Sequence, residues 1–419
     1  MTSTVENCNR LVSKRFKRWS WALFLVGGAV GTTLPGQLFL LASKVWARVK
    51  LRAAPVQDHP FRSPAPTEVV FLRLGRAFLV ATLISAAFSK KPTMALAISA
   101  GFALLFFVVA LGTKDVVGAL GPEVPRRLVD WILIAGVVGA LYGIYLVQVR
   151  GFSRAEGWSA GPNGFGGLCS LLAIFAIGAS VEARKVSWRF VTIPVFLAAM
   201  AFSLSRGSWM GFIVSVIVFG VLLALSKRRG SRYVKWTALF LLIILVVTSA
   251  LAASKPPIRN RAMSAFSLAR NMDRILIWQT ALEMIKDRPL TGVGGGVFPL
   301  VYHEYSVAGE RRAEISFAHN LPLHILAEFG ILGFIPFFAM IGLAVVRGWK
   351  VARVSSPLIM ATYSGFIGTL AHELVDNIAI GMNFGGLFWF LIGYHVHLYG
   401  ELHELRRGEA LSPSETVTA

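Results

Sequence analysis

Long apolar runs constrain this chain more than any other feature of its sequence. Of its residues, 55% are hydrophobic and 15% are charged. Several apolar stretches approach or pass the roughly 20 residues that a helix needs to cross a bilayer. The sequence therefore predicts an all-α polytopic membrane protein. Its apolar runs are expected at 67–89, 93–112, 129–149, 165–183, 188–204, 207–226, 233–252, 320–345, 357–378 and 384–400.

The excess of positive charge is explained by a membrane topology. The formal net charge is +21, which alone would suit nucleic-acid binding. Most Lys and Arg residues, however, lie in short loops between apolar runs, as cytoplasmic loops of membrane proteins do. No nucleic-acid partner is therefore expected. The cysteines Cys8 and Cys169 provide neither a disulfide framework nor a metal site.

Loop charges also predict which side each segment occupies. Basic residues before Trp19 place the N-terminus in the cytoplasm, and the apolar run 20–43 ends in a second basic cluster that begins at Lys44. One crossing would leave that cluster outside, whereas a hairpin of two short helices would return it inside, and we favour the hairpin. This topology gives about twelve spans. It divides the chain into N-terminal transmembrane helices (1–252), a large periplasmic loop (253–318), C-terminal transmembrane helices (319–400) and a cytoplasmic tail (401–419).

The large outer loop carries charge that is unusual for its side of the membrane. Loops away from the cytoplasm are normally poor in Lys and Arg, yet this one contains Arg274, Lys286, Arg288, Arg311 and Arg312. The guanidinium group is a planar fork of donors that matches phosphate oxygens. We therefore expect the loop to bind an anionic, phosphate-bearing ligand.

The apolar run after this loop opens with polar residues. His319 lies at its mouth, where a neutral imidazole could accept a proton from an attacking hydroxyl, although a helix-end cap is the simpler alternative. Asn320 can cap the helix. Asn320, His324 and Glu328 recur at every fourth position and share one helix face. Polar side chains in a span face either a wet cavity or a neighbouring helix, and the pattern leaves both alternatives open.

Three further outer positions carry candidate groups. Arg206, in SLSRGSWMG, stands at the outer end of its run, as a functional group or as an anchor that reaches the membrane surface. Arg288, in DRPLTGVGGG, precedes glycines whose N–H groups could help it to bind a phosphate. His372 and Glu373, with Asp376, end another run, where they could orient a sugar or hydrogen-bond one another.

Taken in order, these motifs resemble a known family. An Arg-Gly pair, the segment R…W…AL…DRPLTGVGGGVF and the sequence HNLPLHILAEFGILG after one large outer loop are together similar to the O-antigen ligase family, and GPNGFGG at 161–167 fits the same pattern. The motifs cover residues 161–335. The same superfamily includes O-antigen polymerases and bacterial protein O-oligosaccharyltransferases.

The resemblance implies a metal-independent glycosyltransferase of the GT-C type, without a cofactor, in the inner membrane of a Gram-negative bacterium. Its donor would be a glycan on undecaprenyl pyrophosphate, and its acceptor would be a sugar hydroxyl of lipid A-core on the periplasmic face. By motif match, His319 takes the role of the family's essential histidine. Arg206 and Arg288 take the roles of pyrophosphate-binding arginines, and Arg274 matches a recurring family arginine less closely.

Other functions remain open at this point. One large loop and a short tail favour a ligase over a polymerase, which tends to have two sizeable outer loops. They also favour it over the protein-modifying enzymes, whose C-terminal regions are often longer. A transporter or flippase for lipid-linked glycans would explain the number of spans and Glu328 in the membrane, but not arginines gathered beside a histidine.

Overall fold

The computed structural model describes most of the chain after residue 65 as helices. The described residues are 66–113, 126–157, 161–183, 187–226, 244, 246–247, 249–250, 253–264, 272–306, 315–380 and 382–411, and no strand occurs among them. The hairpin expected over 20–43, most of the run at 233–252 and the loop arginines Arg311 and Arg312 lie outside the described residues.

Apart from 20–43 and 233–252, each apolar run expected from the sequence is a helix. Many of these helices begin at a proline, whose missing N–H costs nothing in a first turn. Their bounds are α3 Pro66–Ala87, α4 Pro92–Leu104 with the π-helical continuation η1 Leu105–Ala110, α6 Arg126–Gln148, α7 Pro162–Ala183, α8 Trp188–Phe202, α9 Arg206–Leu225, α14 Leu321–Ala352, α15 Pro357–Glu373 and α16 Met382–Leu411. The outer segment adds α11 Pro256–Met263, α12 Met272–Asp287 and α13 Phe298–Tyr305.

Five of the described helices are long and apolar enough to cross a membrane. They are Pro66–Ala87, Pro92–Ala110, Pro162–Ala183, Arg206–Leu225 and Leu321–Ala352. Two shorter apolar helices, Ile132–Gln148 and Trp188–Phe202, accompany them. This composition is that of a multi-pass membrane protein, and the expected total of about twelve spans stays a prediction.

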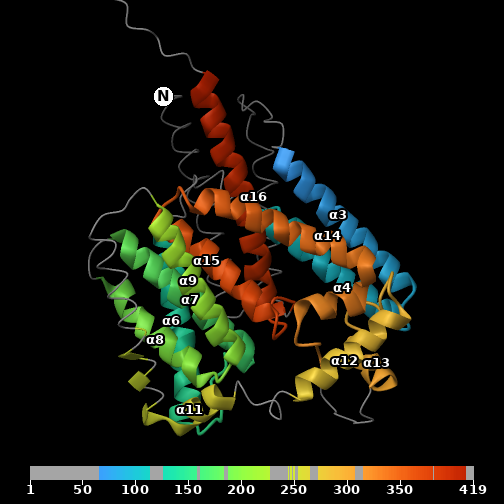
Figure 1. The fold of residues 1–419 in the computed structure, drawn as a ribbon, viewed down its shortest axis with the longest axis horizontal. Coiled ribbons are helices and arrows are strands. Elements are labelled where there is room, and N and C mark those ends of the chain that lie inside the picture. The colour runs from blue at the N-terminus through green and yellow to red at the C-terminus, as the bar shows by residue number, and fades with distance from the viewer. Residues whose placement is uncertain are drawn as a thin grey trace, which may run out of the picture.

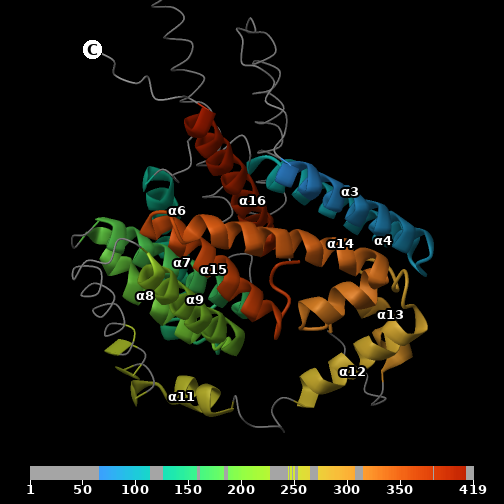
Figure 2. The same cartoon turned by 45° about the horizontal axis from the view of Figure 1, so that its top comes forward.

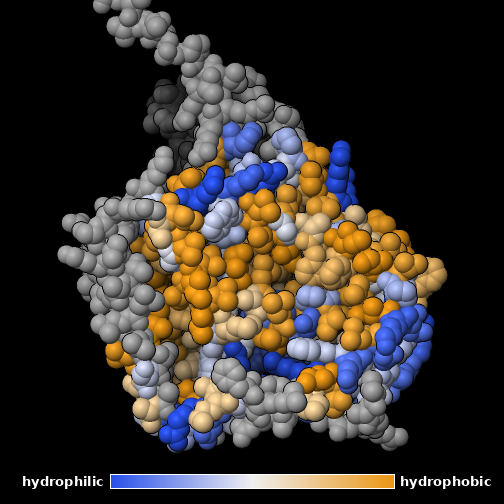
Figure 3. Space-filling model, in the orientation of Figure 1, coloured by the Kyte–Doolittle hydropathy of each residue, from blue (hydrophilic) through white to orange (hydrophobic). Residues whose placement is uncertain are grey.

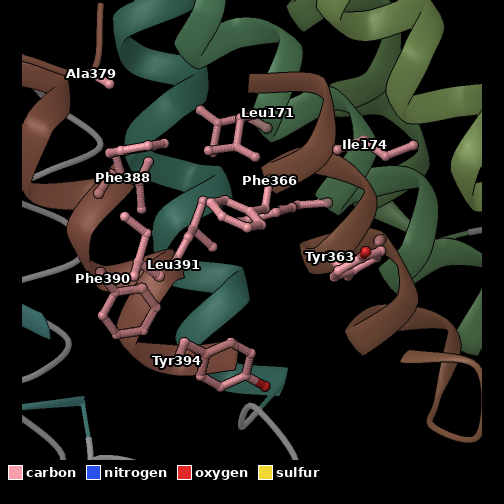
Figure 4. Packing of buried hydrophobic residues seen from close by; sticks show 14 of the residues in the cluster. Leu171, Ile174, Tyr363, Phe366, Ala379, Phe388, Phe390, Leu391 and Tyr394 are labelled. Carbon is pink, nitrogen blue, oxygen red and sulfur yellow. The ribbon is translucent and has the colours of Figure 1, made fainter. Parts of the chain in front are cut away.

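The helices form two groups that meet along one seam. The first group packs α6, α7, α8, α9 and α15 together, and the second packs α3, α4, η1, α14 and α16 (Figure 1). The helices α14, α15 and α16 join the groups. Figure 2 shows α11, α12 and α13 at the end of the molecule opposite the free end of α16. In Figure 4, Phe366 of α15 lies among Leu171 and Ile174 of α7 and Phe388 and Leu391 of α16, so apolar packing closes part of the seam.

The helix α14 is broken at Gly330, and the loop after α12 fills the break. Gly330 has φ 58° and ψ −168°, a backbone conformation that is essentially restricted to glycine. The helical hydrogen bonds around it are replaced by bonds to the loop. The carbonyls of Ala327 and Glu328 accept from Val293 N (2.9 Å) and Gly294 N (3.0 Å). In return, Ile331 N and Leu332 N donate to the carbonyls of Pro289 (2.9 Å) and Leu290 (3.2 Å).

Two glycines make this exchange possible. A Cβ on Gly330 would lie 2.3 Å from the carbonyl carbon of Leu290, and one on Gly292 would lie 2.3 Å from that of Glu328. Gly292 also has a positive φ of 68°. The backbones therefore approach too closely for any side chain, and the loop 289–294 is fixed to the membrane helix by main-chain bonds. This contact holds α12 and α13 against α14.

Candidate functional site

A strained turn between α8 and α9 organises one side of the site. Leu204 has a positive φ of 52°, which is uncommon for a residue with a branched side chain. Ser205 caps α9 by accepting from Ser208 N at 3.3 Å, so Arg206 is the first residue of that helix. The turn directs its carbonyls at two arginines: Ser203 O accepts from Arg154 Nε at 2.8 Å, and Leu204 O accepts from Arg261 Nε at 3.0 Å.

His319 lies directly before α14, on the other side of the seam. Its φ is 50°, and together with Leu204 it accounts for the non-glycine residues with positive φ in the described parts of the chain. The next residue, Asn320, is the N-cap of α14, as the sequence predicts, and its Oδ1 accepts from Leu323 N at 2.9 Å. Its Nδ2 donates to Leu374 O at 2.9 Å. Backbone strain at two positions of one site is typical of functional geometry.

Asp376 connects the two helix groups at this point. Its Oδ1 lies 2.8 Å from Nδ1 of His319 and accepts from Asn377 N at 2.9 Å, and its Oδ2 lies 3.8 Å from Nη2 of Arg274. Burial acts to raise the pKa of Asp376, but the hydrogen bond from His319 and the charges of His319 and His372 outweigh it, and the pKa lies below its ordinary value. The carboxylate is therefore charged at neutral pH and can hold the Nδ1–H tautomer of His319.

Four arginines form a cluster that reaches this pair through Arg274. The charges of Arg261 and Arg274 act on both Arg154 and Arg206, and Asp376 acts on Arg154. Burial and then the charge of Arg261 lower the pKa of Arg154. Arg206 donates from Nη1 to Ser264 O at 2.8 Å. Guanidinium groups that repel one another and are fixed by main-chain carbonyls form a site prepared for a multiply charged anion.

Arg288 lies away from this cluster. It follows the last residue of α12, whereas Arg274 lies in the first turn of that helix, so about 21 Å of helix separates their backbones at 1.5 Å per residue. Arg288 Nη1 donates to Phe88 O at 2.6 Å, beside α3. The structure brings Arg206 and Arg274 to His319 and does not bring Arg288 there.

The glycine-rich loop after Arg288 has a structural task. The structure limits the expectation that its N–H groups help to bind a phosphate, because Val293 N and Gly294 N donate to the broken helix α14 and Gly292 N donates to Arg288 O at 3.0 Å. A backbone donor that is already bonded to a carbonyl is not available for an anion.

The remaining sequence candidates on α14 and α15 contact other helices or loops. His324 and Glu328 are buried, with Nε2 and Oε2 3.4 Å apart, and Glu328 Oε1 accepts from Phe298 N at 3.3 Å. These contacts favour the helix-contact alternative over a wet cavity. Glu373 Oε1 accepts from Ala379 N at 2.9 Å and Ile378 N at 3.2 Å, so it shapes the loop that carries Asp376.

Two site arginines, Arg154 and Arg261, are absent from the sequence-based candidates. The signal that could have found them is the one that selected Arg206, because both lie in pieces of chain expected on the outer side, where arginine is rare. The sequence marks Asp376 only as a polar neighbour of His372 and Glu373. Its bond to His319 joins residues 57 positions apart, and no local pattern encodes it.

One comparison with known proteins covers part of this site. Residues 190–338 match the family model described as O-antigen ligase. The matched stretch contains Arg206, Arg261, Arg274 and His319, and it ends before His372 and Asp376. No curated protein matches the chain.

Proposed function

Because residues 190–338 match the family model described as O-antigen ligase, we propose that this multi-pass membrane protein transfers a glycan from undecaprenyl pyrophosphate to a sugar hydroxyl of lipid A-core. The observation that carries this proposal is the junction at which the His319–Asp376 pair meets four arginines. Glycan transfer from a lipid diphosphate needs a group that activates a hydroxyl and fixed positive charge for the departing diphosphate. The junction supplies both within one site.

His319 is the proposed general base. With Nδ1–H donated to Asp376 Oδ1 at 2.8 Å, the lone pair of Nε2 is left to accept the proton of the acceptor hydroxyl. The acceptor oxygen then bonds to the sugar carbon as the bond from that carbon to the diphosphate oxygen breaks. The electron pair leaves with the diphosphate, and the proton stays on Nε2 until it passes to water.

The arginines are proposed to bind the diphosphate. Arg154, Arg206, Arg261 and Arg274 remain charged at any working pH, and each presents donors that fit phosphate oxygens. Among the described residues, no group of three His, Cys, Asp or Glu side chains is placed to hold a metal ion. We propose that fixed arginines supply the positive charge that stabilises the leaving group in a metal-independent reaction.

The membrane setting fits a lipid-linked donor. In Figure 3, hydrophilic residues gather between α9 and α12, below an apolar surface formed by neighbouring helices. A polyprenyl chain could remain in the bilayer while its diphosphate reaches such a site. We propose that the site faces the periplasm of a Gram-negative inner membrane, with 253–318 as the outer loop, because the basic clusters of the short loops assign the opposite ends of the helices to the cytoplasm. The acceptor residues stay a proposal: Asn320 follows His319 directly, and Nε2 of His372 lies 4.0 Å from Oδ2 of Asp376.

A transfer assay with the purified full-length protein tests this function. Undecaprenyl-pyrophosphate-linked glycan and lipid A-core are supplied in detergent, with EDTA in a parallel reaction. We expect glycan on lipid A-core in both reactions. Glycan chains that lengthen on the lipid carrier would instead identify a polymerase, and glycan on an acceptor protein would identify a protein oligosaccharyltransferase. Movement across vesicles without transfer would identify a transporter, and activity that EDTA removes and a divalent ion restores would contradict metal independence.

Arg274→Lys and Arg288→Lys form a matched pair of variants on one helix. An ammonium keeps the charge but loses the bidentate fork, so we expect Arg274→Lys, like Arg206→Lys, to lower transfer about tenfold to a hundredfold. Arg288→Lys should keep transfer within a few-fold, because Arg288 bonds to Phe88 O away from His319. Initial transfer rates at equal amounts of folded protein measure both effects. An equal loss of transfer rate in the two variants would instead place Arg288 in the donor-binding site, as the sequence resemblance implies.

A further inference from the structure

Two buried atoms beside the proposed base lack a hydrogen bond. Nε2 of His372 and Oδ2 of Asp376 are both without a partner, although His372 is 1% exposed and Asp376 is 4% exposed. The two atoms lie 4.0 Å apart, on residues one helical turn apart in the chain. A buried donor or acceptor that stays unpaired costs about 1–3 kcal/mol. The pair is therefore one short movement from a hydrogen bond that neither atom makes in this structure.

The helices around His372 are shaped to admit its ring. A Cβ on Gly207 of α9 would lie 2.2 Å from Cδ2 and 2.5 Å from Nε2 of His372, and one on Gly167 of α7 would lie 3.2 Å from its Nδ1. Gly207 follows Arg206 in the Arg-Gly pair, and Gly167 ends GPNGFGG. Two motifs from different parts of the sequence thus leave space for one imidazole. An apolar side chain would fill that space as well, yet the ring there is an imidazole whose Nε2 has no partner, which points to a hydrogen bond.

Arg274 is the other donor near Oδ2 of Asp376, at 3.8 Å. It comes from α12, which packs on α14 of the second helix group, and a diphosphate in the site would attract it. His372 lies on α15, in the segment that leads directly to Asp376. When Arg274 turns to the ligand, His372 is the donor that remains beside this oxygen.

We propose that His372 is a positioning residue that donates a hydrogen bond from Nε2 to Oδ2 of Asp376 when the diphosphate engages Arg274. Oδ1 of Asp376 then stays on Nδ1 of His319 while the transferred proton arrives. The movement required is about 1 Å, from 4.0 Å to an ordinary hydrogen-bond length. This inference rests on the proposed glycan transfer.

Few charged groups compete for His372. Among the described residues, the charges that act on His372 are those of Asp376, in the loop after α15, and Arg274 on α12. The neighbours from α7 and α9 are the glycines that form its slot. A change at His372 should therefore act on transfer through Asp376 and His319.

The test compares His372→Phe with His372→Gln. Phenylalanine fills the slot without a donor, whereas the glutamine amide can donate to Asp376. We expect His372→Phe to lower kcat about tenfold to a hundredfold, the usual effect of one hydrogen bond to a charged group. KM for the donor should hardly change, and the acidic limb of the pH–rate profile should move to lower pH, because a misaligned carboxylate supports protonated His319 less well. His372→Gln should restore kcat to within a few-fold of the wild type.

Glycine variants on one helix provide an independent measurement. Gly207→Ala places a Cβ against the ring and should reproduce the lower kcat and the shifted profile. Gly220→Ala is the control, because nothing lies within 4 Å of the Cβ it adds to the same helix. If His372→Phe does not fold, His372→Gln and Gly207→Ala decide the question through their pH–rate profiles. A wild-type kcat and profile in His372→Phe, or equal losses in Phe and Gln variants, would overturn the proposal. A wild-type protein that transfers no glycan would instead refute the proposed function.

Discussion

His319→Gln is expected to lower glycan transfer by about 10²–10⁴-fold, the usual effect of losing a general base, while folded protein and donor binding are retained. Glutamine can donate to Asp376 as Nδ1 does, but it cannot take up a proton at neutral pH. The lowered pKa of Asp376 keeps that carboxylate charged to a lower pH than an ordinary aspartate, so it can still accept from the glutamine amide. Single-turnover transfer rates and equilibrium binding of the donor separate the two effects.

Asp376→Asn is the companion variant for this prediction. Its amide keeps the size of the side chain but removes the charge that supports protonated His319, so we expect slower transfer and an acidic limb at lower pH. Near-wild-type transfer by His319→Gln would leave His319 only a role in orienting the acceptor. A fall in protein yield with normal specific activity would mean that His319 maintains the fold at the start of α14.

Gly330→Ala is expected to cause the largest loss of stability. The glycine-only backbone conformation costs other residues about 1–3 kcal/mol, and the added Cβ would lie 2.3 Å from the carbonyl carbon of Leu290. The loop must then withdraw, which breaks main-chain bonds that are worth about 1 kcal/mol each. We expect little folded protein, or a clearly lower Tm in detergent, measured by size-exclusion chromatography and thermal unfolding.

Gly342→Ala supplies a control on the same helix. Nothing lies within 4 Å of the Cβ that this change adds, and alanine is the better helix former. Its Tm should equal or slightly exceed that of the wild type. A Gly330→Ala protein with an unchanged Tm would show that the exchange of hydrogen bonds between α14 and the loop 289–294 contributes little to stability.

The sequence by itself determined the features that depend on neighbouring residues. Apolar runs near the length of a bilayer crossing placed the helices, and Asn320 before an apolar run predicted the cap of α14. Arg206 and Arg274 were identified as candidates because arginine is rare on the outer side of a membrane protein. The side on which each residue lies can be judged from the charges of the loops alone. These features required no knowledge of which helices pack together.

The tertiary structure decided which of these groups meet. Packing of the two helix groups brings Asp376 to His319, and Arg154 and Arg261 to the turn at Leu204. The length of α12 separates Arg288 from Arg274, although both lie in one basic loop in the sequence. The glycines after Arg288 suggested a phosphate site, but Val293 N and Gly294 N bond to the broken helix α14 and Gly292 N bonds to Arg288 O. Such contacts join residues far apart in the chain, and a backbone group or side chain binds whichever partner the packing places within reach, so local sequence patterns do not specify them.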